Sequence, residues 1–154
     1  MPDGLYERDA LAWSERQADL LRRLAAGERV NEMVDWPNLI DEVEAVGRSE
    51  LRSCESLLRQ AMVHLLKLAA WPGSRAAAHW RGETIGFLAD ARRCFSSSMR
   101  QRIDLADLYA TALRQVRAVT DDAGEPRPLP EACPFVLDDL LDTSADVKTF
   151  VDRI

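Results

Sequence analysis

Residues 35–73 have the sequence DWPNLIDEVEAVGRSELRSCESLLRQAMVHLLKLAAWPG, and this stretch decides the fold. Its apolar residues recur at steps of three and four, which places them on one face of a long helix. Asp35 can accept a hydrogen bond from the free amides of the first turn, and a proline is tolerated there. Pro72 ends the pattern, so the helix is predicted over residues 38–71. The predicted buried face consists of Ile40, Val43, Gly47, Leu51, Cys54, Leu58, Ala61, Leu65 and Leu68.

The sequence on either side predicts more helices. Before the long helix, a row that begins at Trp13 predicts a helix over residues 9–26, and Gly27 stands where it would stop. After it, Ser74 is placed to cap a helix over residues 75–95.

The carboxyl-terminal part predicts two further helices. Ser98 and Gln101 have the spacing of a capping box, which predicts a helix over residues 99–123. Three alternating prolines then predict an extended connector over residues 126–130, because proline donates no backbone hydrogen bond. A short helix follows over residues 134–142, and the tail has room for one more helical turn.

Composition supports an all-α fold. The chain has 154 residues, of which 6% are aromatic and seven are glycine, and a β-fold needs more of both. This length fits one domain with its own core, so residues 1–154 are predicted to form a single helical domain. Short connections favour an antiparallel four-helix bundle-like core with a long second helix and the short carboxyl-terminal helix packed across one end.

Charge and cysteine content limit the function classes. The formal net charge of -6 disfavours nucleic acid as a partner, because phosphate repels an acidic protein. The three cysteines lack the spacing of a zinc ribbon or a redox motif. The amino-terminal residues do not resemble a signal peptide, and the sequence contains no long apolar stretch for a membrane. We therefore expect a cytoplasmic protein with no membrane contact.

Several carboxylates and both histidines could act as metal ligands. Helical bundles hold metals with carboxylates and histidines from several helices, and Glu42, Glu44, His64 and His79 are the available candidates. Each also has a simpler interpretation. The glutamates complement the dipole at the start of a helix, and His79 can pair with Glu83 one turn away. The sequence lacks the Glu-x-x-His pattern of carboxylate-bridged metal sites, and it predicts no cofactor and no catalytic residue.

Several parts of the chain together resemble one bacterial family. The most specific is the stretch from Asp35 to Glu50, with its Asp-Trp-x-Asn-Leu-Ile run and acidic trio. The others are Trp13, Gln17 and Leu20-Leu21 before it, and His64-Leu65-Leu66-Lys67, Arg75, Trp80, Thr84-Ile85, Cys133-Pro134-Phe135, Leu137 and Leu140-Leu141 after it. These residues are similar to the "domain of unknown function 29" family. The resemblance implies an all-helical fold and no activity.

The favoured hypothesis is a non-enzymatic protein–protein interaction module. A well-specified helical fold without a catalytic motif favours a helix face or groove that contacts another protein or a second copy of the chain. The alternative is a metal-dependent enzyme with ligands that project from a helical bundle. The predicted contact residues, expected to meet in space, are Asp35, Trp36, Asn38, Glu42, Glu44, Arg75 and Trp80.

Overall fold

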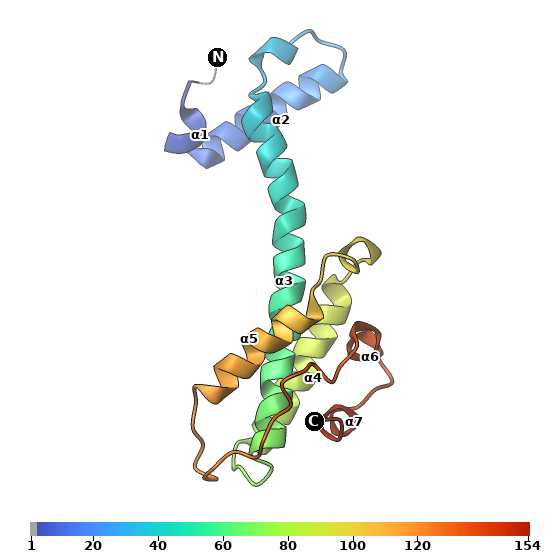
Figure 1. The fold of residues 1–154 in the computed structure, drawn as a ribbon. Helices are drawn as coiled ribbons and strands as arrows, with labels where there is room; N and C mark the ends of the chain where they lie inside the picture. The colour runs from blue at the N-terminus through green and yellow to red at the C-terminus, as the bar shows by residue number, and fades with distance from the viewer. Residues whose placement is uncertain (1–2) are drawn as a thin grey trace. The chain divides into compact units, whose positions relative to one another are not determined.

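The computed structural model describes residues 3–154, which form helices joined by loops (Figure 1). No β-strand occurs in this part of the chain, so the predicted all-α class is confirmed. Every helix in it is too short or too polar to cross a lipid bilayer. The helices are α1 (Leu5–Arg8), α2 (Ala10–Ala25), α3 (Trp36–Ala70), α4 (Ala77–Cys94), α5 (Leu105–Arg117), α6 (Leu137–Leu141) and α7 (Val147–Val151), with 3-10 turns at Asn31–Met33 and Ser97–Met99.

The chain divides into two compact units, Met1–Arg48 (unit 1) and Ser49–Ile154 (unit 2). Helix α3 contributes its first turns to unit 1 and the rest to unit 2. Helix α2 belongs to unit 1, whereas α4 and α5 belong to unit 2. A single domain with an antiparallel bundle of four helices therefore stays a prediction.

Unit 1 is built around α2. The side chain of Asp9 accepts a hydrogen bond from the backbone N–H of Ala12 at 3.0 Å and so caps the helix. The chain leaves α2 through Gly27, whose φ of 90° is the left-handed conformation that glycine adopts without strain. The buried apolar cluster of this unit is small and consists of Leu20, Val30 and Val34, with Leu24 and Leu39 against it.

Unit 2 holds the large apolar core. The second half of α3 supplies Cys54, Leu58, Ala61 and Leu65, and none of these four has any exposed surface. Helix α4 packs on this segment, and the Cys54 thiol lies 3.8 Å from the carbonyl oxygen of Ala91 on α4. Helices α6 and α7 both contact α4. The tail thus contains the additional helical turn that its sequence had room for.

The prediction that one face of the long helix is buried along its whole length is wrong for the first turns. Ile40 is 53% exposed and Val43 is 67% exposed, although both continue the spacing of the buried residues further along. Helical periodicity determines which side chains share a face, but another element must cover that face before it is buried.

The helix predicted over residues 99–123 is shorter than expected, and the capping box at Ser98 does not form. The Ser98 hydroxyl lies 3.1 Å from that of Ser96, and α5 begins only at Leu105. The carboxylate of Asp104 caps this helix instead, with the backbone N–H of Asp107 at 3.1 Å. Aspartate and serine are about equally good caps, so the capping rules alone do not choose between the two starts.

Two other helix starts also differ from the prediction. Helix α4 begins at Ala77, because Ser74 lies in the preceding turn, where its hydroxyl accepts from the Ala76 backbone N–H at 3.1 Å. Helix α6 spans only Leu137–Leu141 of the predicted 134–142, since extended backbone continues through Val136.

Candidate functional site

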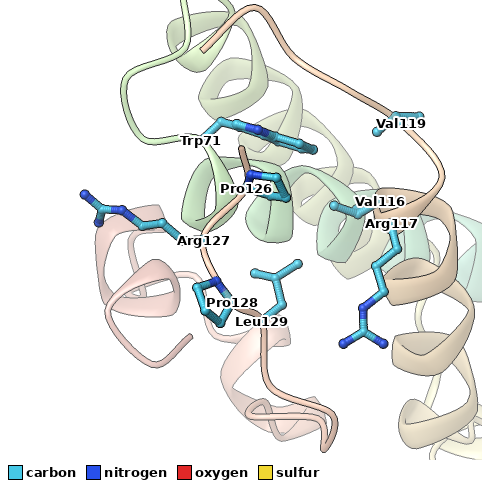
Figure 2. Close-up of a pocket in the computed structure, with 8 residues that line it drawn as sticks. All are labelled: Trp71, Val116, Arg117, Val119, Pro126, Arg127, Pro128 and Leu129. Carbon is cyan, nitrogen blue, oxygen red and sulfur yellow. The ribbon is translucent and has the colours of Figure 1, made fainter. Parts of the chain in front are cut away.

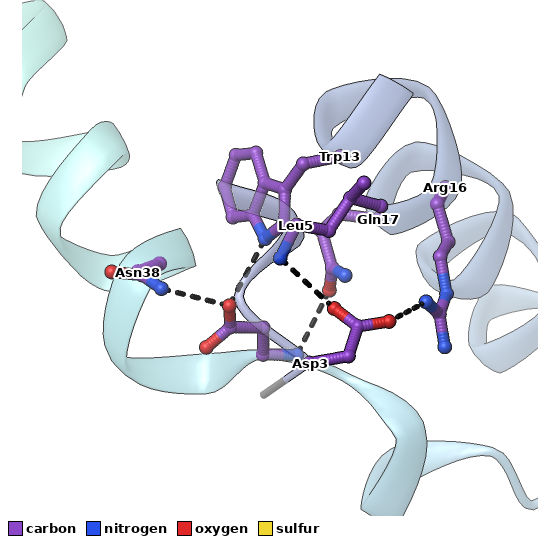
Figure 3. A network of polar contacts seen from close by, with 7 residues as sticks. Asp3, Leu5, Trp13, Arg16, Gln17 and Asn38 are labelled. Carbon is purple, nitrogen blue, oxygen red and sulfur yellow. Dashed lines mark hydrogen bonds and ion pairs between the residues drawn. The ribbon is translucent and has the colours of Figure 1, made fainter. Parts of the chain in front are cut away.

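A polar network in unit 1 centres on the carboxylate of Asp35, and Figure 3 shows its partners Trp13, Gln17 and Asn38. The Oδ2 atom of Asp35 accepts hydrogen bonds from Trp13 Nε1 at 3.0 Å and from Asn38 Nδ2 at 2.8 Å. The backbone N–H of Asp35 donates to Gln17 Oε1 at 2.9 Å. Trp13 and Gln17 lie on α2, and Asn38 lies on α3. The network therefore fixes the first turn of α3 against α2.

These donors favour the charged form of Asp35. They lower the pKa of its carboxyl, chiefly through the Asn38 side chain and also through the Trp13 indole, against an opposing effect of burial. The other oxygen, Oδ1, is buried without a hydrogen-bond partner among the described residues. Because Trp13 and Gln17 are themselves buried, the network is part of the structure of unit 1.

A second group of polar contacts ties the amino-terminal residues to unit 1. Asp3 accepts from the Leu5 backbone N–H at 3.1 Å and from Arg16 Nη1 at 2.6 Å, as Figure 3 also shows. The Tyr6 hydroxyl donates to Glu42 Oε1 at 2.5 Å, and this bond raises the pKa of Tyr6. Tyr6 thus positions the Glu42 carboxylate on the surface of α3.

Five of the predicted contact residues lie on the first turns of α3 or just before them, but they do different things. Asp35 and Asn38 bond inward within the network, and Glu42 is held by Tyr6. Trp36 is 43% exposed while its Nε1 donates to the Asn31 carbonyl oxygen at 2.9 Å. Glu44 is exposed and pairs with Arg48 at 3.4 Å.

The remaining two predicted contact residues belong to unit 2. Trp80 is buried beside Trp71, with ring centroids 6.4 Å apart, and Lys67 Nζ lies 5.6 Å from its ring centroid. Arg75 is exposed. That Arg75 and Trp80 join the contact residues of α3 stays a prediction.

Sequence reasoning missed the α2 side of the network. Trp13 was expected to begin the apolar row of the helix over residues 9–26, and neither Trp13 nor Gln17 was predicted to contact Asp35. The usable signal was that two side chains with hydrogen-bonding groups stand four residues apart on one helix face, and the structure buries both. A buried indole N–H or amide needs a partner, and Asp35 is that partner.

The four candidate metal ligands fall into both units, Glu42 and Glu44 in unit 1 and His64 and His79 in unit 2. His79 is exposed and lies 3.8 Å from Glu83, as the simpler interpretation expected. Among residues 3–154, no group of three or more His, Cys, Asp or Glu side chains is arranged to hold a metal ion. The metal-enzyme hypothesis thus gains no ligand set from the described residues.

His64 is half-buried in unit 2. Its ring lies against Phe87 with 5.4 Å between centroids, and its Nδ1 has no hydrogen-bond partner among the described residues. Burial lowers the pKa of His64, and the charge of Lys67 lowers it further. The neutral imidazole is therefore favoured in the folded protein.

Unit 2 also contains a cavity of about 310 Å³ (Figure 2). Its polar side chains do not converge on a ligand position. Arg117 is paired with Glu131, the Trp71 indole donates to the Gly124 carbonyl oxygen at 2.8 Å, and the two arginine head groups lie at opposite edges of the hollow. Small-molecule sites orient their ligands with several convergent polar groups, so this cavity is a weak candidate. It is lined by Trp71, Val116, Arg117, Val119, Pro126, Arg127, Pro128 and Leu129.

The most unusual surface in unit 1 is a row of exposed apolar side chains on α3. Trp36, Ile40, Val43 and Val46, here named the α3 stripe, are between 43% and 67% exposed. Their steps of four and three place them on neighbouring turns of one side of the helix. Single exposed apolar side chains are common on protein surfaces, but a continuous row indicates a contact surface.

The fold and this surface define an all-helical protein that presents an apolar helix face beside a buried polar network. Residues 5–145 match the family described as "Domain of unknown function DUF29", and the chain belongs to that family. The chain is also similar to the crystal structure of an alpha-helical protein of unknown function from Rhodospirillum rubrum. The sequences are 28% identical, the TM-score is 0.72, and the match covers 97% of this chain and 96% of the other. None of the curated proteins matches the chain.

Proposed function

We propose that this protein is a non-enzymatic protein–protein interaction module that binds its partner through the α3 stripe. The observation that carries the proposal is the exposure of Trp36, Ile40, Val43 and Val46 in consecutive turns of an ordered helix. A partner that covers this apolar row removes it from water, which is favourable by about 25 cal/mol of free energy for each Å² of apolar surface buried. Proteins commonly recognise one another by packing such a helix face against a groove or another helix.

The Asp35 network supports the proposal because it holds the stripe in place. Trp36 follows Asp35 directly, and Ile40 lies one turn further along. With Asp35 bonded to Trp13 and Asn38, the first turn of α3 is fixed against α2 before any partner arrives. A surface ordered in advance binds with a smaller entropic cost. Asp35 and Asn38 therefore act by positioning the surface.

The stripe and its supporting network both lie in unit 1, so the proposal rests on contacts within that unit. We also infer a bacterial cytoplasmic location. The cysteines Cys54, Cys94 and Cys133 are all free thiols, which fits a reducing compartment.

The test is site-specific photo-crosslinking in cells. A photoreactive amino acid at Val43 is expected to give a discrete crosslinked protein, and the same group at Glu15 on the outer face of α2 is not. The captured protein is then purified, and its binding is measured against the wild type and Val43→Glu. Because Val43 is 67% exposed, this substitution is expected to leave the fold intact and to abolish binding. Equal crosslinking at both positions, or unchanged binding by Val43→Glu, would show that the stripe is not the contact surface.

A further inference from the structure

Acidic side chains flank the α3 stripe, and they limit what can dock on it. At 100° per residue, Glu44 lies beside Ile40 on one side of the row and Glu42 lies beside Val46 on the other, whereas Asp41 lies on the opposite side of the helix. All three are exposed. Arg48 belongs to the same side as Glu44 and is paired with it at 3.4 Å. A segment that covers the stripe must therefore place its own edges next to carboxylates.

The whole of unit 1 has the same sign of charge. Residues 1–48 contain eleven acidic and six basic side chains, so they hold five of the six net negative charges of the chain. Charge of one sign around an apolar contact favours partners of the opposite sign and speeds their association.

A second copy of the chain is disfavoured as the occupant of the stripe by the same charges. A symmetric dimer brings the same surface of both copies together. Here it would place Glu42 and Glu44 of one copy close to the acidic flanks of the other. Like charges across an interface are costly, so the flanks favour a different protein with basic edges.

The spacing of the stripe indicates the shape of that partner segment. Trp36, Ile40 and Val43 follow steps of four and three, and residues at such steps interdigitate with those of another helix. We propose that the α3 stripe binds an amphipathic helix of another protein whose apolar row is bordered by lysine and arginine. This inference rests on the proposed function and names its partner class.

Two synthetic helical peptides test the proposal. Each has about 20 residues and the same leucine row, but one has lysine and arginine at its borders and the other has glutamate. Fluorescence anisotropy with the full-length protein is expected to show binding of the basic peptide at least about tenfold tighter than that of the acidic one, with the difference shrinking as salt rises. Val43→Glu is expected to abolish binding of the basic peptide.

A matched pair of charge reversals separates the stripe from the overall charge. Glu42→Lys with Glu44→Lys is expected to weaken binding of the basic peptide about tenfold. The control, Glu15→Lys with Asp19→Lys, changes the net charge by the same amount on the face of α2 opposite Trp13 and Gln17. It is expected to weaken binding of the basic peptide less than about threefold. Circular dichroism checks that every variant keeps its helices.

Five results would overturn the inference, and they separate it from the proposed function. If the acidic peptide binds as tightly as the basic one and Val43→Glu abolishes that binding, the charge argument is contradicted but the stripe remains a contact surface. Equal weakening by both charge-reversal pairs shows that only the overall charge acts. A wild-type dimer in sedimentation, broken by Val43→Glu, assigns the stripe to a second copy. No binding of the basic peptide at about 100 µM, or binding unaffected by Val43→Glu, contradicts both proposals.

Discussion

The two halves of helix α3 have the same apolar spacing and opposite surroundings. In unit 1, Ile40 and Val43 are mostly exposed, whereas in unit 2 Leu58 and Ala61 have no exposed surface. The second half is covered by other helices of its own unit. The Cys54 thiol contacts the Ala91 carbonyl oxygen on α4, and Arg59 donates to Gln115 on α5 at 2.8 Å. One periodic pattern thus serves as core in one half and as free surface in the other.

The two units are also stabilised differently. Unit 2 depends on a large apolar core to which α3, α4 and α5 all contribute. Among its described residues, unit 1 has a small buried apolar cluster of Leu20, Val30 and Val34, and it adds the hydrogen bonds of Asp35 with α2. Apolar burial dominates the stability of one unit, whereas polar contacts are a large share in the other.

The largest expected effect comes from shortening an apolar residue in each half of α3. Leu58→Ala is expected to lower the free energy of unfolding by about 3 kcal/mol, because it leaves a cavity in a filled core. Ile40→Ala, its counterpart on the exposed stripe, is expected to change the free energy of unfolding by less than about 0.5 kcal/mol. Urea unfolding measures both. Similar losses in the two variants would show that the first half of α3 is covered in solution.

The Asp35 network is expected to give an intermediate effect. Trp13→Phe removes the indole donor from a partly buried carboxylate and is expected to cost about 2 kcal/mol in urea unfolding. Trp36→Phe removes an indole hydrogen bond at an exposed position, so its cost is expected to stay below about 0.5 kcal/mol. A Trp13→Phe cost no larger than that of Trp36→Phe would mean that the network does not stabilise unit 1.

The smallest expected effect is a difference in pH response between the units. The pKa of His64 is lowered by burial, so unfolding adds a proton and stability falls as pH drops below about 6.5, the ordinary histidine value. The pKa of Asp35 is also lowered, but this group is an acid, so its lowered pKa stabilises the folded protein at pH values above about 3.9. That stabilisation is lost only as the pH falls through the lowered pKa.

A non-titrating variant isolates the histidine contribution. The urea midpoint of the wild type is expected to fall between about pH 7.5 and pH 5.5, and that of His64→Gln is expected to fall less. Parallel curves for the two proteins would show that His64 is not buried as a neutral group.

Local signals in the sequence were sufficient for much of the fold. The steps of three and four from Ile40 to Leu68 predicted one long helix, and Pro72-Gly73 marked its end near Ala70. Where two caps competed, the sequence was ambiguous. Ser98 and Asp104 both satisfy the rules for an N-cap, and in the structure Asp104 is the residue that caps α5.

The candidate site was predicted in part. The stretch from Asp35 to Glu44 was singled out by its resemblance to a family, and it carries both the network and the stripe. Its partners Trp13 and Gln17 lie on α2, and hydrogen bonds between separate helices leave no periodic signal in a sequence.

The sequence by itself determined which residues are helical and which of them share a face, because both follow from local backbone geometry. The tertiary structure decided which part of that face is covered. Leu58 is buried because other helices lie against it, and Val43 is exposed because no element of unit 1 covers it among the described residues. Burial depends on contacts between segments far apart in the chain, which local spacing does not encode.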